Sequence, residues 1–337
     1  MSIRNWAIIG YGIVLAAFVV LPVAGVYPIL LINILFYTIF AAAFHLLLGY
    51  GGLLSLGHAA FFGSSGYLAG YFVVRYGVSP ELALLAGVCS GALLGFGVGV
   101  LSIRRSGIYF AMITLAFAQL VYFICLQLPA TGGEDGMQGI ERGRLFGLLD
   151  LHNDVTLYYC VLVLTVLVLL AIARIVHSPY GDVLRAIKDN ESRVMSLGYD
   201  TYLYKLILFI LSAGFTGLAG SIKALSQGFV TLSDVHWLAS GDPLVMSLVG
   251  GVGFLSGPVV GATLIVTLLN RTEGVAHELA SWTGIEAIGT FGSSAVLIVG
   301  LFFILCALGF RGGIMGSVTH WVAQLSGKRG RPARLRE

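Results

Sequence analysis

One short, charged stretch of this chain lies between two long apolar runs. This stretch, residues 174–205, contains a Ser178-Pro179 pair from which a helix can begin, and charged residues then alternate with apolar ones at helical spacing. Such a segment can bind a partner protein in the aqueous phase. Its apolar side chains would supply the contact area, and its charged side chains at the edge of the contact would fix the register. We expect residues 178–198 to form one amphipathic helix that docks on a partner outside the membrane, with a solvated interfacial helix as the alternative. The residues expected to carry this contact are Pro179, Tyr180, Gly181, Val183, Leu184, Arg185 and Ile187.

Two Gly-rich stretches, residues 49–63 and 249–258, place small polar groups inside otherwise apolar segments. Glycine and proline interrupt helices, and broken backbone at membrane depth is tolerated only inside protein or beside a water-filled cavity. Paired interrupted segments in a transporter point to its substrate pathway. For His58, a structural hydrogen bond and a place on the pathway are equally open readings. The candidates for lining a pathway are Ser55, His58, Thr114, Ser256 and Gly257.

No catalytic or metal-binding constellation is found in the sequence. The four cysteines each stand alone in an apolar run, and no phosphate-binding glycine loop ending in Lys-Ser or Lys-Thr occurs. We therefore expect no enzyme activity, no metal and no cofactor in this chain. If ATP drives its function, the nucleotide is bound by another subunit. An ion-coupled secondary transporter, the alternative from a different class, usually carries carboxylates within its spans, and we place none clearly there.

The composition excludes a soluble globule, because 58% of the 337 residues are hydrophobic and only 10% are charged, against about 25% charged in soluble domains. The sequence predicts an all-α integral membrane protein, a polytopic bundle of roughly 8–10 transmembrane helices with broken or re-entrant segments. The expected spans lie near residues 6–24, 28–48, 53–74, 82–101, 108–128, 156–176, 204–225, 243–269 and 289–310, of which 243–269 does not cross simply.

The distribution of charge orients these spans through the positive-inside rule. Residues 104–105, 174–205 and the C-terminal tail are basic and are expected in the cytoplasm. The acidic segment 130–155 is expected outside, together with residues 226–242 and 271–288. The expected domains are an N-terminal membrane helix over 1–27, a permease-like domain over 28–316 and a basic cytoplasmic tail over 317–337. The outer segment begins with a turn that we expect to act as a gate or receptor-facing loop, formed by Thr131, Gly132 and Gly133.

Five of these stretches together resemble one family, the LivM-type permease subunits of ABC importers for branched-chain amino acids and related solutes. The matching stretches are residues 51–63, 107–116, 131–136, 178–198 and 250–262, and they occur in order between residue 28 and residue 316. The resemblance implies a multi-pass protein of the bacterial inner (plasma) membrane whose segment 178–198 couples it to an ATPase.

The same resemblance implies the partners. They would be a second, homologous permease subunit, two cytoplasmic ATPase subunits, an external solute-binding protein and membrane lipid, with no role for nucleic acid. This chain would form half of a pathway for branched-chain amino acids. A subunit of an importer for urea, short amides or other small organic solutes is the alternative within the same class, because the binding protein selects the solute.

Overall fold

The chain folds almost entirely into helices. The computed structural model describes residues 16–283, 295–309 and 312–317 and separates into two compact units. One unit is Leu35–Leu244, and the other combines Met1–Ile34 with Val245–Glu337. Within the described residues, the strands are pieces of two residues each. The predicted class, an all-α polytopic membrane protein, is therefore confirmed.

Five stretches of the described chain are long and apolar enough to cross a membrane: Pro28–Tyr50, Pro80–Ser102, Ile108–Gln127, Asp154–Val176 and Thr201–Gln227. Each agrees within a few residues with a predicted span. The first consists of α2 (Pro28–His45) and a π-helix, η1 (Leu46–Tyr50), and the other four are α4, α5, α6 and α9. A further helix, α3 (His58–Tyr76), starts five residues after the predicted start of its span.

Local sequence explains where these helices begin and end. Ser79 precedes a proline at the first position of α4, and the side chains of Asn153 and Asp200 accept hydrogen bonds from the first turns of α6 and α9. Gly77 and Gly228 end α3 and α9 in the left-handed conformation that suits glycine. The boundaries follow from capping chemistry that the sequence displays directly.

The centre of the unit Leu35–Leu244 is a close packing of α3, α4 and α9. Small residues make this approach possible. A Cβ atom placed on Gly220 of α9 would lie 1.9 Å from the carbonyl oxygen of Phe62 in α3, and one placed on Gly91 of α4 would lie 2.6 Å from the carbonyl oxygen of Ala213. Backbone therefore packs directly against backbone, as it does in membrane helices that associate through glycine.

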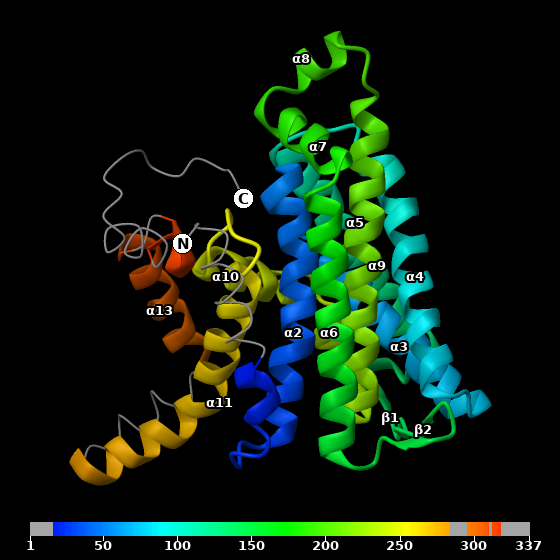
Figure 1. Ribbon diagram of the computed structural model, residues 1–337. Coiled ribbons are helices and arrows are strands. Elements are labelled where there is room, and N and C mark those ends of the chain that lie inside the picture. The colour runs from blue at the N-terminus through cyan, green and yellow to red at the C-terminus, as the bar shows by residue number, and fades with distance from the viewer. Residues whose placement is uncertain (1–15, 284–294, 310–311, 318–337) are drawn as a thin grey trace. The chain divides into compact units, whose positions relative to one another are not determined.

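The two ends of this unit differ. Two short helices, α7 (Pro179–Asp189) and α8 (Glu191–Ser196), lie at one end of the helices, and the short strands lie at the other (Figure 1). We name these the basic end and the outer end. At the outer end β1 (Met137–Gln138) pairs with β4 (Phe229–Val230), and β2 (Arg144–Leu145) pairs with β3 (Leu149–Asp150).

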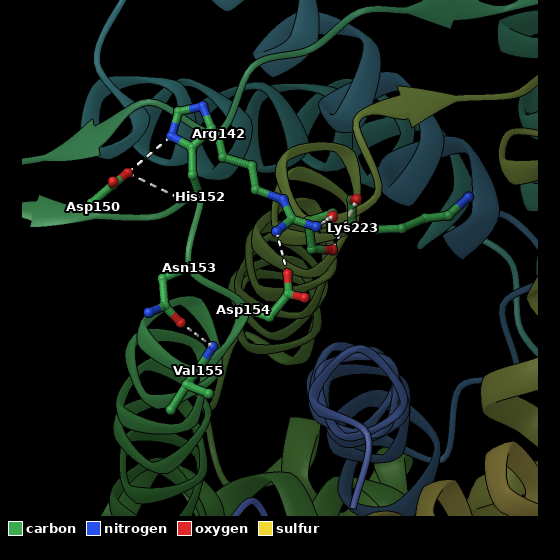
Figure 2. A network of polar contacts seen from close by, with 8 residues as sticks. Arg142, Asp150, His152, Asn153, Asp154, Val155 and Lys223 are labelled. Atoms are coloured by element: carbon green, nitrogen blue, oxygen red, sulfur yellow. Dashed lines mark hydrogen bonds and ion pairs between the residues drawn. The ribbon is translucent and has the colours of Figure 1, made fainter.

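An arginine fastens the outer segment to two helices. The Arg142 guanidinium donates to Asp154, the first residue of α6, at 2.5 Å and to the Ser226 carbonyl near the end of α9 at 2.7 Å (Figure 2). Nearby, two hydrogen bonds from His152 lower the pKa of the exposed Asp150 carboxyl. The bond from the backbone amide has the larger effect, and the bond from the imidazole ring has the smaller one. The outer segment is thus anchored to the bundle by side chains as well as by the β1–β4 pair.

The second unit contains α11 (Gly257–Thr283) and α13 (Ala295–Gly309), while α10 (Gly241–Gly250) starts in the first unit and ends in the second. The helix breaks between Gly250 and Gly257, as predicted for 243–269. Close packing follows the break, since a Cβ atom on Gly261 would lie 1.8 Å from the Met246 carbonyl oxygen. Most of the predicted span 6–24, the end of 271–288 and the basic tail beyond residue 317 lie outside the described residues.

Candidate functional site

The first broken segment begins where the π-helix η1 ends. Gly52 has a φ of +66°, and residues 52–57 then run without helix until α3 starts at His58. π-Helical turns are rare and are frequently found at functional sites. A break within the membrane thickness leaves backbone groups that lipid cannot satisfy, so this segment needs partners from neighbouring elements.

Hydroxyl side chains provide those partners. The Leu56 amide donates to Thr114 Oγ1 of α5 at 3.1 Å, and the Gly57 amide donates to Ser55 Oγ at 3.2 Å. Ser240 Oγ accepts from the Ala59 amide at 2.9 Å and donates to the Leu56 carbonyl at 2.9 Å. Ser55, Thr114 and Ser240 have no measurable exposure. In this conformation they satisfy the broken backbone, so a role in lining the pathway stays a prediction that requires the segment to open.

His58 is equally buried and joins α3 to α9. Its Nε2 lies 2.8 Å from Ser212 Oγ, and the Ser212 hydroxyl donates to the Ala43 carbonyl at 2.6 Å. Since the single hydroxyl proton is used on Ala43, the network assigns the Nε2–H tautomer to His58. Its Nδ1 has no hydrogen-bond partner among the described residues. The rings that pack around it at edge-on angles are Phe44, Phe61 and Phe209.

Residues 226–242, which we expected outside the membrane, do not form a free outer loop. After β4, two short 3₁₀ turns, η4 (Leu232–Asp234) and η5 (Trp237–Ser240), lead back beside α3 until Ser240 bonds to Leu56. Leu56 is itself held by Thr114, which lies within the span Ile108–Gln127. We name residues 231–242 the re-entrant segment. Span counting missed it because it is short and polar, and a Ser-Gly-Asp-Pro sequence inside an apparent loop gives only a weak signal.

An ion pair holds the start of the re-entrant segment. Lys223 of α9 pairs with one oxygen of Asp234, while the other oxygen accepts hydrogen bonds from the amide and hydroxyl of Thr231 at 3.0 and 3.1 Å. Both charged side chains are largely buried, with exposed fractions of 10% for Lys223 and 14% for Asp234. Asp234 is therefore fully partnered, and the pair contributes no net charge.

A shallow cavity of about 350 Å³ lies where the end of α5 meets the re-entrant segment. The Tyr122 and His236 rings meet edge-on at its wall. Its lining residues are Tyr122, Leu232, Ser233, His236 and Leu238. Among the described residues, no group of three or more metal-binding side chains occurs.

The segment expected to be one docking helix over 178–198 is two helices. Asn190 adopts an extended conformation between α7 and α8, and its side chain accepts a hydrogen bond from the Arg193 amide. Pro179 does begin α7 after the Ser178 cap, as predicted. The break arises because asparagine favours caps over helix interiors.

The side chains of α7 that are buried and those that are exposed also differ from our expectation. Leu184 and Ile187 are only 1% and 4% exposed, so the prediction that these two side chains face a partner is wrong. Gly181 is buried as well, and Tyr180, Val183 and Arg185 are half-buried. The apolar face packs on α6, α9 and η1 instead, which removes it from water. The exposed face of α7 consists of Pro179, Asp182, Ala186, Lys188 and Asp189.

Three polar contacts fix α7 to three different elements. The Tyr180 hydroxyl donates to the Tyr204 carbonyl of α9 at 2.8 Å, and burial raises the pKa of this phenol. Arg185 donates to the Val176 carbonyl at the end of α6 at 2.9 Å. Lys188 Nζ donates to the Gly49 carbonyl of η1 at 2.6 Å. The Lys188 contact links the surface of the basic end to the first broken segment.

The outer turn, by contrast, is a structural element in this conformation. The buried Thr131 hydroxyl donates to the carbonyls of Cys125 and Leu128, which caps the end of α5. Gly132 and Gly133 have φ values of +80° and +60°, and a Cβ atom on Gly132 would overlap the Gly136 carbonyl. A gate or receptor-facing role for these residues stays a prediction.

Ser256 and Gly257 lie in the other unit, at the second break. Ser256 is half-buried, and its carbonyl accepts a hydrogen bond from the Val260 amide at 3.2 Å as α11 begins. Gly257 is buried, and a Cβ atom there would lie 2.5 Å from the Gly251 carbonyl oxygen. Both residues serve the turn between α10 and α11, and their expected role in a pathway also stays a prediction.

Comparison with known proteins shows which family this chain resembles in sequence. The model of the family described as branched-chain amino acid transport system/permease component matches residues 27–307. The LivM high-affinity branched-chain amino acid transport permeases of Salmonella typhimurium and Escherichia coli are each 30% identical over 257 residues, which is 68% of this chain and 60% of theirs. The fructose import permease FrcC of Rhizobium meliloti is 24% identical over 252 residues, 72% of this chain and 65% of that protein. No solved structure matched.

Proposed function

Because the chain belongs to the family of branched-chain amino acid transport permease components, we propose that it is a membrane subunit of an ATP-driven ABC importer. The family match over residues 27–307 carries the proposal. The chain spans about 60% of the length of the LivM relatives, so the substrate and partners of those proteins are part of the proposal. The protein is a multi-pass membrane protein, and we place it in the bacterial inner membrane with its basic end in the cytoplasm.

The partners follow from what this chain would need for transport. No ATP-binding loop occurs in the sequence, so ATP would be hydrolysed by two separate cytoplasmic subunits. We place these subunits on the exposed face of α7, whose contacts with α6, α9 and η1 would carry their movement into the membrane. A homologous second permease would supply the other half of the pathway, and an external solute-binding protein would deliver the solute to the outer end.

Branched-chain amino acids are the proposed substrates. The LivM relatives are named for this transport, and the small polar groups of a largely apolar pathway suit a zwitterion with an aliphatic side chain. Urea, short amides and other small organic solutes are the alternative, since the fructose permease shows likeness over a similar length. An ion-coupled transporter is the competing class.

Reconstitution in proteoliposomes tests the function. The chain, its partner permease, both ATPases and the binding protein should together take up leucine only when ATP is present. Omission of ATP or of the binding protein should abolish uptake. Leucine uptake by this chain alone along a proton gradient would overturn the proposal, and uptake of urea but not leucine by the complete complex would replace its substrate.

The exposed face of α7 should control association with the ATPases. Ala186→Arg adds a long charged side chain to the middle of that face, where we expect it to weaken association about fivefold, or about 1 kcal/mol. Pull-down of the ATPases at a series of concentrations measures the change. Ser106→Arg, an equally exposed position between α4 and α5 at the same end, is the matched control. Equal weakening by both variants would contradict a specific contact at α7.

A further inference from the structure

The cavity between α5 and the re-entrant segment lies near the outer end of the bundle. Tyr122 is the fifteenth of the 20 residues of α5 (Ile108–Gln127), which places it about 8 Å from the outer end of that helix at 1.5 Å per residue. The cavity holds about 350 Å³, within the roughly 300–1,000 Å³ of small-molecule sites. A solute released at the outer end can therefore reach it before it enters the bundle.

Hydrogen bonding fixes which nitrogen of His236 is available in this cavity. Its Nδ1 accepts from the Leu238 amide at 3.4 Å, so the neutral ring carries its proton on Nε2. The ring stands edge-on to Tyr122, with the two ring centroids 5.2 Å apart, which holds the imidazole at the wall. Ser233 is exposed and adds a hydroxyl. The wall therefore offers hydrogen-bond donors without a charged side chain.

The remaining lining is apolar. Leu232, Leu238 and the ring of Tyr122 offer contact to an aliphatic side chain, while the N–H and O–H donors suit a carboxylate. An uncharged site favours a ligand whose own charges cancel, because it has no counter-ion to offer. A zwitterionic amino acid with an aliphatic side chain meets all of these conditions, whereas urea has no apolar part.

Two buried polar atoms close to this wall have no hydrogen-bond partner among the described residues. They are the side-chain oxygen of Gln119 and the hydroxyl of Tyr67. Gln119 lies three residues before Tyr122, one turn deeper on the same face of α5. Tyr67 of α3 belongs to the apolar cluster on which Tyr122 and Leu232 pack. Unpartnered buried groups are costly, so an ammonium group that moved inward from the cavity would supply the donor that both oxygens lack.

We propose that this cavity is the outer binding site for a zwitterionic amino acid with an aliphatic side chain. The Nε2–H of His236 and the Ser233 hydroxyl donate to its carboxylate, and Gln119 and Tyr67 receive its ammonium group on the way inward. The proposal rests on the proposed function and names the place at which the solute first meets this chain. A shallow site holds the solute loosely, which suits a protein that has to pass it on.

Protection from labelling tests binding at this site directly. In the complex of both permeases and the ATPases, Ser233→Cys should react with a small water-soluble thiol reagent, since this position is exposed. Leucine, added without binding protein, should slow the reaction about twofold at a concentration on the order of 1 mM, the half-occupancy of a weak site. Urea should not slow it. Leu148→Cys, an exposed position in the turn between β2 and β3, is the matched control and should react equally with and without leucine. Mass spectrometry of the labelled peptides separates both positions from the native cysteines.

Two substitutions at His236 separate solute contact from structural support. His236→Gln keeps an N–H donor at a similar reach, whereas His236→Asn is better suited to accept from the backbone amide two residues on but reaches less far. In the reconstituted transporter, His236→Asn should lower leucine uptake roughly tenfold, as expected for the loss of a hydrogen bond to a charged group, and His236→Gln should keep about half of it. ATP hydrolysis stimulated by the loaded binding protein should stay close to wild type in both.

Gln119→Leu tests the inward step. The substitution removes the unpartnered oxygen and keeps a similar volume, so the thermal midpoint should stay at or above that of wild type. Leucine uptake should nevertheless fall roughly tenfold, because the ammonium group loses an acceptor. Normal uptake, or a lower midpoint, would overturn the role of Gln119.

Other results bear on the cavity itself. A greater loss of uptake in His236→Gln than in His236→Asn would show that the ring only supports the re-entrant segment. Equal slowing at positions 233 and 148, or equal slowing by urea and leucine, would also overturn the inference. Normal uptake by the wild-type complex without protection of position 233 overturns the site and leaves the proposed function. Protection of position 233 in a wild-type complex that shows no uptake dependent on ATP and binding protein overturns the proposed function and supports the site.

Discussion

Gly220→Ala is expected to destabilise the folded protein strongly. The added methyl group would sit 1.9 Å from the Phe62 carbonyl oxygen and 2.7 Å from its carbon, so only separation of α3 from α9 can relieve the overlap. Overpacking lowers the free energy of unfolding by about 1–3 kcal/mol where side chains can shift. Here backbone faces backbone and cannot move aside, so we expect a loss at the upper end of that range. A loss of about 3 kcal/mol lowers the ratio of folded to unfolded protein roughly 100-fold. The monodisperse fraction in detergent and its thermal midpoint measure the effect.

Gly97→Ala is the matched control for this prediction. Gly97 lies in α4, and a Cβ atom there would have no neighbour within 4 Å. Alanine also favours helix over glycine by about 1 kcal/mol in a helix interior, so this variant should be at least as stable as wild type. If Gly220→Ala were as stable as Gly97→Ala, the direct backbone contact between α3 and α9 would be refuted.

Lys188→Met is expected to separate ATP hydrolysis from transport. Methionine keeps the apolar stem that packs on Gly52 but removes the hydrogen bond to the Gly49 carbonyl. A hydrogen bond from a charged donor contributes about 1.5–3 kcal/mol, so its loss weakens the link between α7 and η1 by roughly 10- to 100-fold. In the reconstituted transporter, leucine uptake per ATP hydrolysed should fall at least tenfold while hydrolysis itself continues.

Two variants test whether the bond or merely the charge matters. Lys188→Arg retains a cationic donor at this position and should recover much of the uptake per ATP. Arg105→Met removes an exposed positive charge at the same end without touching η1 and should behave as wild type. Normal coupling in Lys188→Met, with ATPase association also normal, would show that movement of α7 reaches the membrane by another route.

Much of the fold could be predicted because its causes are local. Pro80, the Ser178-Pro179 pair and the length of each apolar run mark helices whatever they pack against. The re-entrant segment has no such mark. Its 3₁₀ turns are too short for a hydropathy signal. Ser240 is held in place because the first turn of α3 offers it the Ala59 amide and the broken segment before α3 offers it the Leu56 carbonyl.

The site was predictable in part for the same reason. Broken backbone singled out Ser55 and His58. However, Ser212 bonds to His58 from 154 positions away and Ser240 bonds to the Leu56 carbonyl from 184 positions away, which no local pattern reports. The periodicity of α7 correctly grouped Leu184 with Ile187 on one face. It could not show whether that face met another subunit or the helices of its own chain, since both remove apolar area from water.

The re-entrant segment also constrains the order in which the chain is built. Residues 231–242 carry six polar or charged side chains, and their short turns leave peptide groups without internal partners: Thr231, Ser233, Asp234, His236, Ser240 and Asp242. An insertion machinery that releases segments sideways into lipid by their hydrophobicity has no reason to release this one. We therefore expect it to enter after α3, α5 and α9 have assembled around a place for it, late in the folding of its unit.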